Sequence, residues 1–253
     1  FQLNRIPKLN KFTLLIRHLD GTPFRKLAEQ ENISHMTAYR SCMNALKELP
    51  HCADLTRKYC NKFSGHLLVD GKYIKVKGYD RKIPVIYGID YLTHDIPTYL
   101  LTVGENYASC ISFFSSLRLL EYPLQALICD ENVNIYEACL NVYPKTNVQL
   151  CQNHFKENIR KNLSVRTDVT YRYFMSKIQY LFESKRSLNE FNHIARLILN
   201  EFSNDPICVK VMLDIEHKKH FLLGHLAEKP IPRTTNLIES FNSHLNGRLK
   251  TIK

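Results

Sequence analysis

The sequence predicts a mixed α/β protein that is preceded by a small helical unit and interrupted by an all-helical segment. Apolar, β-branched runs separated by short turns begin at residue 66, and strand-like runs then alternate with helical periodicity as far as residue 151. Residues 152–230 lose the strand pattern and read as successive helices with proline breaks. With 253 residues, the chain can bury a substantial core as one large domain or as two.

Residues 1–50 are expected to form a helix-turn-helix unit. An amphipathic stretch ends at Gly21, Thr22 and Pro23 are expected as the N-cap and first residue of a second helix, and Ser34 is expected to cap a third. In this motif the last helix lies in the major groove and reads bases with its first residues, whereas a plain helical hairpin is the alternative. The residues expected to contact DNA are Ser34, His35, Thr37, Tyr39 and Arg40.

After a connector at residues 51–65, the α/β core is expected over residues 66–151. It opens with a three-strand meander and continues with a helix, a strand, a short helix and a strand. Residues 152–231 are the expected helical insertion, and residues 232–253 contain a final helix that starts near Thr234 or Thr235.

The net charge of +11 is unevenly distributed along the chain. Residues 66–150 hold 9 acidic against 7 basic residues and form the net acidic block, whereas the segments on either side are basic. A polyanion-binding surface with a local acidic pocket has this pattern, although many soluble proteins are mildly basic for no single reason. Eight scattered cysteines without a framework, no signal peptide and no membrane-length apolar run predict an intracellular protein, in a bacterial cytoplasm or a eukaryotic nucleus. Because the first residue is Phe1, we expect a piece of a longer protein.

Two aspartates follow apolar runs that are expected to be strands. Asp70 ends the run LLV and Asp130 ends the run ALIC, and the 60 residues between them allow the two strands to lie side by side. Carboxylates forced together raise each other's pKa unless a cation lies between them, and Mg²⁺ prefers such oxygen ligands. Alternatively, Asp70 and Gly71 form a turn, and Asp130 with Glu131 caps the next helix.

Glu239 is the candidate for a third acid because it is the single acidic residue among the last 22. It lies one turn into the final helix, where it could face the pair of aspartates. The alternative is that it merely satisfies the preference for acids in a first helical turn. Asp90, at the end of the second meander strand, is the main rival, but we expect it to point away from the pair.

The strings VDGKYIKV, CDEN, LCQNHFKENIR and TTNLIESFN together resemble the DDE transposases of the Mutator-like group and its bacterial insertion-sequence relatives. The resemblance covers about residues 66–250, and its most specific parts are the Cys-x-x-His at Cys151–His154 and the TTNxIExxN ending. It implies an RNase H-like fold with a helical insertion before the last acid. It also implies that Asp70, Asp130 and Glu239 are the catalytic triad and hold two Mg²⁺ or Mn²⁺ ions.

Cys151 and His154 have the spacing of half a tetrahedral zinc site, but no second half is evident and zinc is not expected. The resemblance implies instead that the pair supports the active site, with His154 as a catalytic residue near the scissile phosphate; a structural histidine is a further alternative. Side chains expected to contact DNA phosphates on this helix and on the final one are Lys156, Arg160, Lys161, Asn236, Asn242, His244, Arg248 and Lys250.

These observations predict a DNA transposase that cleaves transposon ends with metal ions and transfers strands into target DNA. The alternatives are a domesticated, sequence-specific DNA-binding regulator without catalysis and an RNase H-like nuclease. The expected partners are terminal inverted repeats and target DNA, with the protein acting as a homodimer or higher oligomer on DNA and without a membrane.

Overall fold

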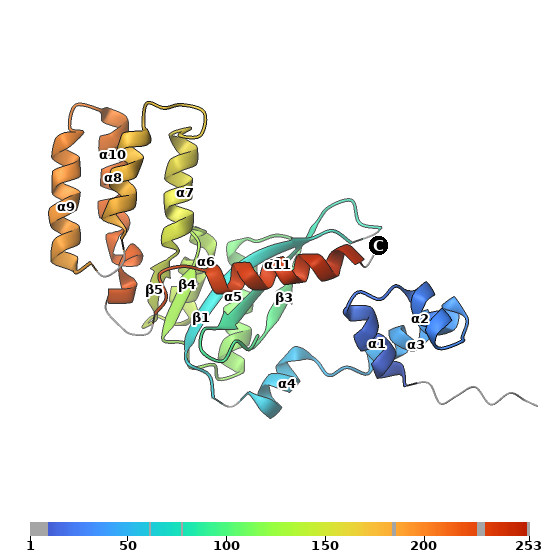
Figure 1. The fold of residues 1–253 in the computed structure, drawn as a ribbon. Helices are drawn as coiled ribbons and strands as arrows, with labels where there is room; N and C mark the ends of the chain where they lie inside the picture. Colours follow the sequence, from blue (N-terminus) through green and yellow to red (C-terminus); the bar gives the residue numbers. More distant parts are fainter. Residues whose placement is uncertain (1–9, 61, 77, 184–185, 227–230, 252–253) are drawn as a thin grey trace, which may run out of the picture. The chain divides into compact units, whose positions relative to one another are not determined.

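The computed structural model describes residues 10–60, 62–76, 78–183, 186–226 and 231–251, with side chains described up to residue 246 (Figure 1). The chain divides into two compact units, one of residues 1–55 with 240–253 and one of residues 56–239. No helix within the described ranges has the length and apolar character needed to cross a membrane.

Three short helices occupy the N-terminal unit where the sequence predicts them. Ser34 caps the third helix, since its hydroxyl oxygen accepts a hydrogen bond from the backbone N–H of Thr37 at 3.0 Å. The second helix starts one residue later than expected: Pro23 is its N-cap rather than its first residue, and Thr22 therefore does not cap it. A small core holds the three together, built from Leu14, Leu15, Leu27, Ala28, Ala38, Cys42 and Ala45. The helices are α1 (Lys11–Leu19), α2 (Phe24–Gln30) and α3 (His35–Lys47).

The segment expected to be a connector contains a helix, α4 (Cys52–Tyr59). The hydroxyl of Thr56, which is buried, donates to the carbonyl of Pro97 at 2.7 Å. The last part of α4 is therefore fastened to the loop between the second and third strands, a long-range contact that sequence periodicity does not reveal.

A five-stranded mixed sheet forms the centre of the larger unit, in the order β3-β2-β1-β4-β5. β2 runs antiparallel to β1 and β3, whereas β4 runs parallel to β1 and β5. The strands are β1 (His66–Ile74), β2 (Ile83–Asp90), β3 (Tyr99–Leu101), β4 (Ala126–Cys129) and β5 (Asn147–Leu150).

Asp70 is not a strand end, contrary to the sequence reading, because β1 continues to Ile74. Residues 71–74 stay in the sheet by pairing with residues 83–86 of β2. On the other side of β1, the pairing with β4 stops earlier, since β4 ends at Cys129. Asp70 therefore lies at the point where β1 loses its parallel neighbour.

One hydrophobic core runs from the sheet into the helical insertion. Leu67, Leu127 and Val148 of the sheet belong to the same cluster as Phe113 of α5 and Phe174 of α8. Figure 1 shows α7–α10 side by side at one end of the sheet. The helices are α5 (Tyr107–Leu119), α6 (Val133–Val142), α7 (Gln152–Asn162), α8 (Arg172–Leu181), α9 (Leu188–Glu201), α10 (Pro206–Leu222), a 3₁₀ turn η1 (Gly224–Leu226) and α11 (Asn236–Thr251).

The end of the insertion is fastened to the sheet beside the start of α7. The buried amides of Gln149 and Gln152 both donate to the carbonyl of Leu222, each at 2.9 Å. At Gly224 a Cβ would lie 2.6 Å from the carbonyl oxygen of Val148, so this close approach requires glycine. The chain consequently returns from the insertion at the edge of the sheet where β5 ends.

Candidate active site

Asp70 of β1 and Asp130, the residue that follows β4, lie near the same carboxylate, Glu105, at one edge of the sheet. Leu68 pairs with Ile128, and continuing this register by two residues sets Asp70 beside Asp130. Strands in a sheet are about 4.8 Å apart, so two half-buried carboxylates emerge close together here. This much of the predicted triad is brought together by the β1–β4 pairing.

Glu105 is a third carboxylate at this edge, and the sequence analysis did not predict it as a site residue. Its Oε1 accepts a hydrogen bond from the side-chain amide of Asn132 at 2.7 Å. Burial raises the pKa of Glu105, as do the charges of Asp130 and Asp70, although the hydrogen bond from Asn132 lowers it. The acid comes from the loop before α5, where no periodicity or motif marks it.

Gly71 shows how closely Glu105 approaches the strand. A Cβ on Gly71 would lie 2.3 Å from Glu105 Oε2. Gly71 is therefore not the turn residue that the sequence suggested: it lies within β1, and the missing side chain leaves room for the carboxylate.

The adjacent acids Asp130 and Glu131 have different surroundings. Glu131 accepts hydrogen bonds from Asn158 at 2.7 Å and from Lys218 at 2.9 Å, so it turns toward the helical insertion. Asp130 Oδ1 accepts from the backbone N–H of Asn132 at 3.1 Å, while Asn132 itself caps α6. Helix capping is thus carried out by Asn132, and Asp130 remains at the sheet edge.

Asp90, the alternative candidate to Asp70 and Asp130, is fully buried at the end of β2. Burial raises its pKa, but the hydrogen bonds that it accepts outweigh this effect and lower the pKa below its ordinary value. Its role is structural, because its oxygens are used by donors from three segments of the chain. The donors are Ser64 N and Oγ, Leu92 N, Thr93 N and Tyr122 Oη, at 2.7–3.1 Å.

Cys151, His154 and Glu239 form a second group. Their potential ligand atoms all lie within 4.8 Å of one another, and no other such set of three occurs in the described part of the chain. His154 Nε2 is 3.7 Å from Glu239 Oε1. Asp70 and Asp130 are outside this set, so the structure places Glu239 with the Cys-x-x-His motif rather than in one tight cluster with both aspartates.

His154 is electrostatically linked to both groups of acids. Its hydrogen bond with Cys151 and the charges of Cys151, Glu239 and Asp130 together raise its pKa to about 9, against the effect of burial. For Cys151, burial raises the pKa, but the hydrogen bonds with His154 and Thr235 lower it overall. The imidazole thus favours its protonated form between a sulfur atom and a carboxylate.

An open groove of about 560 Å³ lies along α7 in front of these groups. Its lining includes His154, Lys156, Arg160 and Glu239. Burial and the nearby charge of Arg233 lower the pKa of Lys156. Lys161 is exposed on the same helix and is not among the residues that line the groove. Of the three basic residues predicted on α7, two therefore share a surface with His154 and Glu239.

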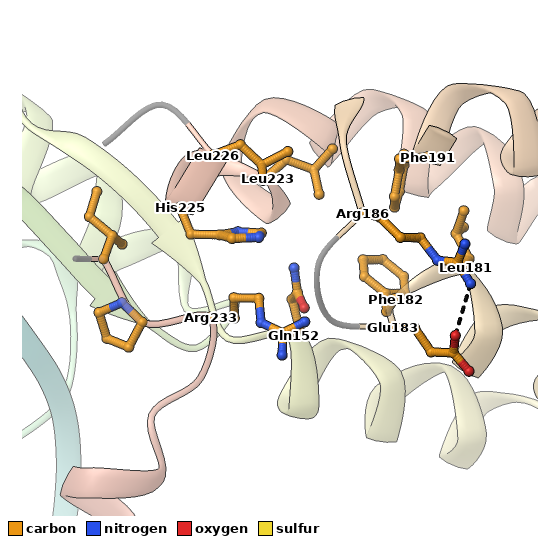
Figure 2. Close-up of a pocket in the computed structure, with 12 residues that line it drawn as sticks. Gln152, Leu181, Phe182, Glu183, Arg186, Phe191, Leu223, His225, Leu226 and Arg233 are labelled. Atoms are coloured by element: carbon orange, nitrogen blue, oxygen red, sulfur yellow. Dashed lines mark hydrogen bonds and ion pairs between the residues drawn. The ribbon is translucent and has the colours of Figure 1, made fainter. Parts of the chain in front are cut away.

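A second, more apolar pocket of about 430 Å³ lies between the helical insertion and residues 231–233, which precede α11 (Figure 2). Its lining includes the apolar side chains of Leu181, Phe182 and Leu223 and the polar side chains of Gln152 and Arg233. Arg186 also lines it, but this cation pairs with Glu183 at 3.0 Å. The pocket therefore adjoins the chain just before Thr235 without containing any of the predicted site residues.

The other predicted DNA contacts lie on α3 and α11. On α3, His35 and Tyr39 are exposed and pack edge-on against Phe24, and Arg40 is exposed. Ser34 and Thr37 share a hydrogen bond of 2.8 Å at the helix start. On α11, Asn236 accepts from Asn153 at 3.2 Å. The remaining predicted residues are Asn242, half-buried; His244, exposed; and Arg248 and Lys250, whose side chains lie outside the described ones.

Acids at a sheet edge beside an open groove with cations suit a protein that handles a polyanion such as DNA. The comparison with known families is more specific: the model of the Mutator family of transposases matches residues 43–253. The chain therefore belongs to the Mutator family of transposases, which implies that it binds DNA. A search of curated proteins gave no match.

Proposed function

We propose that the chain is a DDE transposase with an RNase H-like core, in which Asp70, Asp130 and Glu239 carry phosphodiester cleavage and strand transfer. The observation that carries this proposal is the parallel β1–β4 pairing in a member of the Mutator family: it ends at Leu68 and Ile128, two residues before Asp70 and Asp130. The strand order β3-β2-β1-β4-β5, with β2 antiparallel to β1, supports the RNase H-like assignment. The helical insertion before Glu239 supports the same assignment.

The donor set fits hard divalent cations. Asp70 and Asp130 offer carboxylate oxygens at the sheet edge, and their charges add to the effect of burial in raising the pKa of the nearby Glu105. Asp70, Asp130 and Glu239 would hold two Mg²⁺ or Mn²⁺ ions, and zinc is not part of the proposal. When bound, the ions supply charge stabilisation for the attacking and leaving oxygens of an in-line displacement.

The remaining residues bind and orient DNA. His154 presents a protonated imidazole next to Glu239, where it can contact a phosphate, while Lys156 and Arg160 contact the backbone along the groove. Lys161, Asn236, Asn242, His244, Arg248 and Lys250 add backbone contacts. The first turn of α3 reads bases, through Ser34, His35, Thr37, Tyr39 and Arg40.

The central test compares two adjacent acids. Supercoiled plasmid is incubated with the protein and Mg²⁺ or Mn²⁺, and nicked product is measured. Asp130→Ala is expected to abolish nicking while the affinity for DNA stays within about twofold, because the change removes a metal ligand and no basic contact. The matched control is Glu131→Ala, which removes a carboxylate paired with Lys218 and is expected to keep nicking activity.

The same assay separates the alternatives. A labelled duplex copied from the DNA that flanks the coding sequence is added, and its joining to the plasmid is followed. Joined products support a transposase, nicking without joining supports a nuclease, and binding without either reaction supports a regulator. Nicking that persists in Asp130→Ala contradicts the proposed triad.

A further inference from the structure

Cys151 holds the chain segment that leads into α11. It is buried at the N-cap position of α7, yet its side chain does not cap that helix. Its Sγ instead accepts from the backbone N–H of Thr235 at 3.4 Å and lies 3.2 Å from the hydroxyl oxygen of Thr235. One residue along, the N–H of Gln152 donates to the carbonyl of Arg233 at 3.0 Å, and Figure 2 shows these two residues side by side. The start of α7 thus fixes residues 233–235.

Thr235 in turn contacts the carboxylate of Glu239. Its hydroxyl donates to Glu239 Oε1 at 2.8 Å, and the backbone N–H of Glu239 bonds to the carbonyl of Thr235 at 3.1 Å. A hydroxyl has one proton, and the shorter bond to an ionised oxygen is the stronger one. The hydroxyl of Thr235 therefore donates its proton to Glu239, and the backbone N–H of Thr235 donates to Cys151.

The same hydroxyl oxygen also faces His154 Nδ1, at 3.3 Å. This contact leaves Nε2 directed at Glu239. Oγ1 of Thr235 thus lies within 3.3 Å of an atom of Cys151, His154 and Glu239 alike. An ion bound to all three would sit about 2.0–2.3 Å from each and would compete with this oxygen for the same space. The arrangement therefore favours hydrogen bonds centred on the Thr235 hydroxyl over a metal ion bound by Cys151, His154 and Glu239.

We propose that Thr235 is a positioning residue of this site: Cys151 fixes its backbone, and its hydroxyl aims the Glu239 carboxylate beside His154. Through Thr235, which lies 84 residues after Cys151, the Cys-x-x-His motif then connects the sheet with the last acid. The inference rests on the proposed function, because it gives Glu239 its orientation for cleavage. Thr235 is 2% exposed, so its hydroxyl acts on Glu239 and His154 rather than on DNA directly.

Thr235→Val, Thr235→Ser and Thr234→Val are compared in plasmid nicking. Valine keeps the shape of Thr235 and removes the hydroxyl, so the nicking rate is expected to fall roughly tenfold or more. The Mg²⁺ concentration for half-maximal nicking is expected to rise, while binding of a labelled random-sequence duplex stays within about twofold. Serine is expected to restore the rate because it keeps the hydroxyl. Thr234→Val, a change at the less buried neighbour, is expected to match the wild type.

Each outcome decides the proposal. If Asp130→Ala abolishes nicking but Thr235→Val nicks with normal rate and Mg²⁺ dependence, the positioning role is wrong and the proposed function stands. If Asp130→Ala still nicks, the proposed function itself fails. Thr235→Ala is made alongside, and a failure of both hydroxyl-free variants to fold would make Thr235 structural and overturn the inference.

Discussion

Asp130 and Glu131 are neighbours in the sequence, but the fold gives them different partners. Alternation along an extended chain sends successive side chains in different directions. Glu131 consequently accepts hydrogen bonds from Lys218 and Asn158 of the insertion, whereas Asp130 stays near Asp70 at the edge of the sheet. A residue's type suggests that it can hold a metal, and its position relative to the strand end determines whether it can reach one.

The contact between Gly71 and Glu105 gives a prediction about stability. In Gly71→Ala the new Cβ would force the Glu105 carboxylate away from Asn132, and the lost hydrogen bond is expected to cost about 1–2 kcal/mol of unfolding free energy. In a Glu105→Ala background the same change should cost much less, because the space is then free. Denaturant unfolding of the two single variants and the double variant measures this coupling. Gly104→Ala, where a Cβ meets ordinary contacts, is the control. Additive costs would contradict the proposed contact.

At the scale of elements, α7 carries much of the site on one short helix. Its start contributes Cys151 and His154, and the next turns contribute Lys156 and Arg160 to the groove. Buried positions such as Phe155 and Ile159 fix the rotation of the helix against the core. The 3.6-residue repeat therefore decides which of its basic residues face the groove.

This arrangement predicts a difference between two lysines of α7. Lys156→Ala is expected to weaken binding of duplex DNA and to lower the slope of log affinity against log salt by about 1, as for one lost phosphate contact. Lys161→Ala removes the same charge away from the groove lining and is expected to have a smaller effect. Binding measured over a series of salt concentrations gives both slopes. Equal effects would show that the groove is not the path of the DNA.

At the scale of the whole molecule, Asp90 connects parts of the larger unit that are far apart in sequence. It joins the chain before β1, the loop after β2 and the segment after α5 through Ser64, Thr93 and Tyr122. Because its pKa is lower in the folded chain than in the unfolded one, its carboxylate stabilises the fold fully above about pH 4. That contribution is lost as the pH falls through the lowered pKa.

Asp90→Asn is therefore expected to destabilise the protein at pH 7 by about 2–3 kcal/mol, since an amide cannot accept from all of these donors. It should also flatten the dependence of stability on pH below about 4, where the wild type loses the Asp90 contribution. Thermal unfolding across an acidic pH series checks both effects. Asp80→Asn, at an exposed turn, serves as the control. An unchanged acid profile in Asp90→Asn would assign the acid sensitivity to other groups.

The sequence by itself determined the mixed α/β class, the run of helices after residue 151 and the family, because periodicity and the strings around Asp70, Asp130, Cys151 and Glu239 are local signals. It also singled out those four residues. It misjudged Asp70 as a strand end and gave no sign of α4 within the connector, since strand pairing and the docking of α4 depend on distant partners.

The tertiary structure alone decided which of these residues meet. Register set Asp70 beside Asp130, the return from the insertion set Glu239 beside His154, and a loop brought Glu105 to the sheet edge. Thr235, buried between Cys151 and Glu239, likewise has no local signature for its contacts. The physical reason is that hydrogen bonds and charge interactions act over a few ångströms in space, whereas the residues that make them here are up to 87 positions apart in the chain.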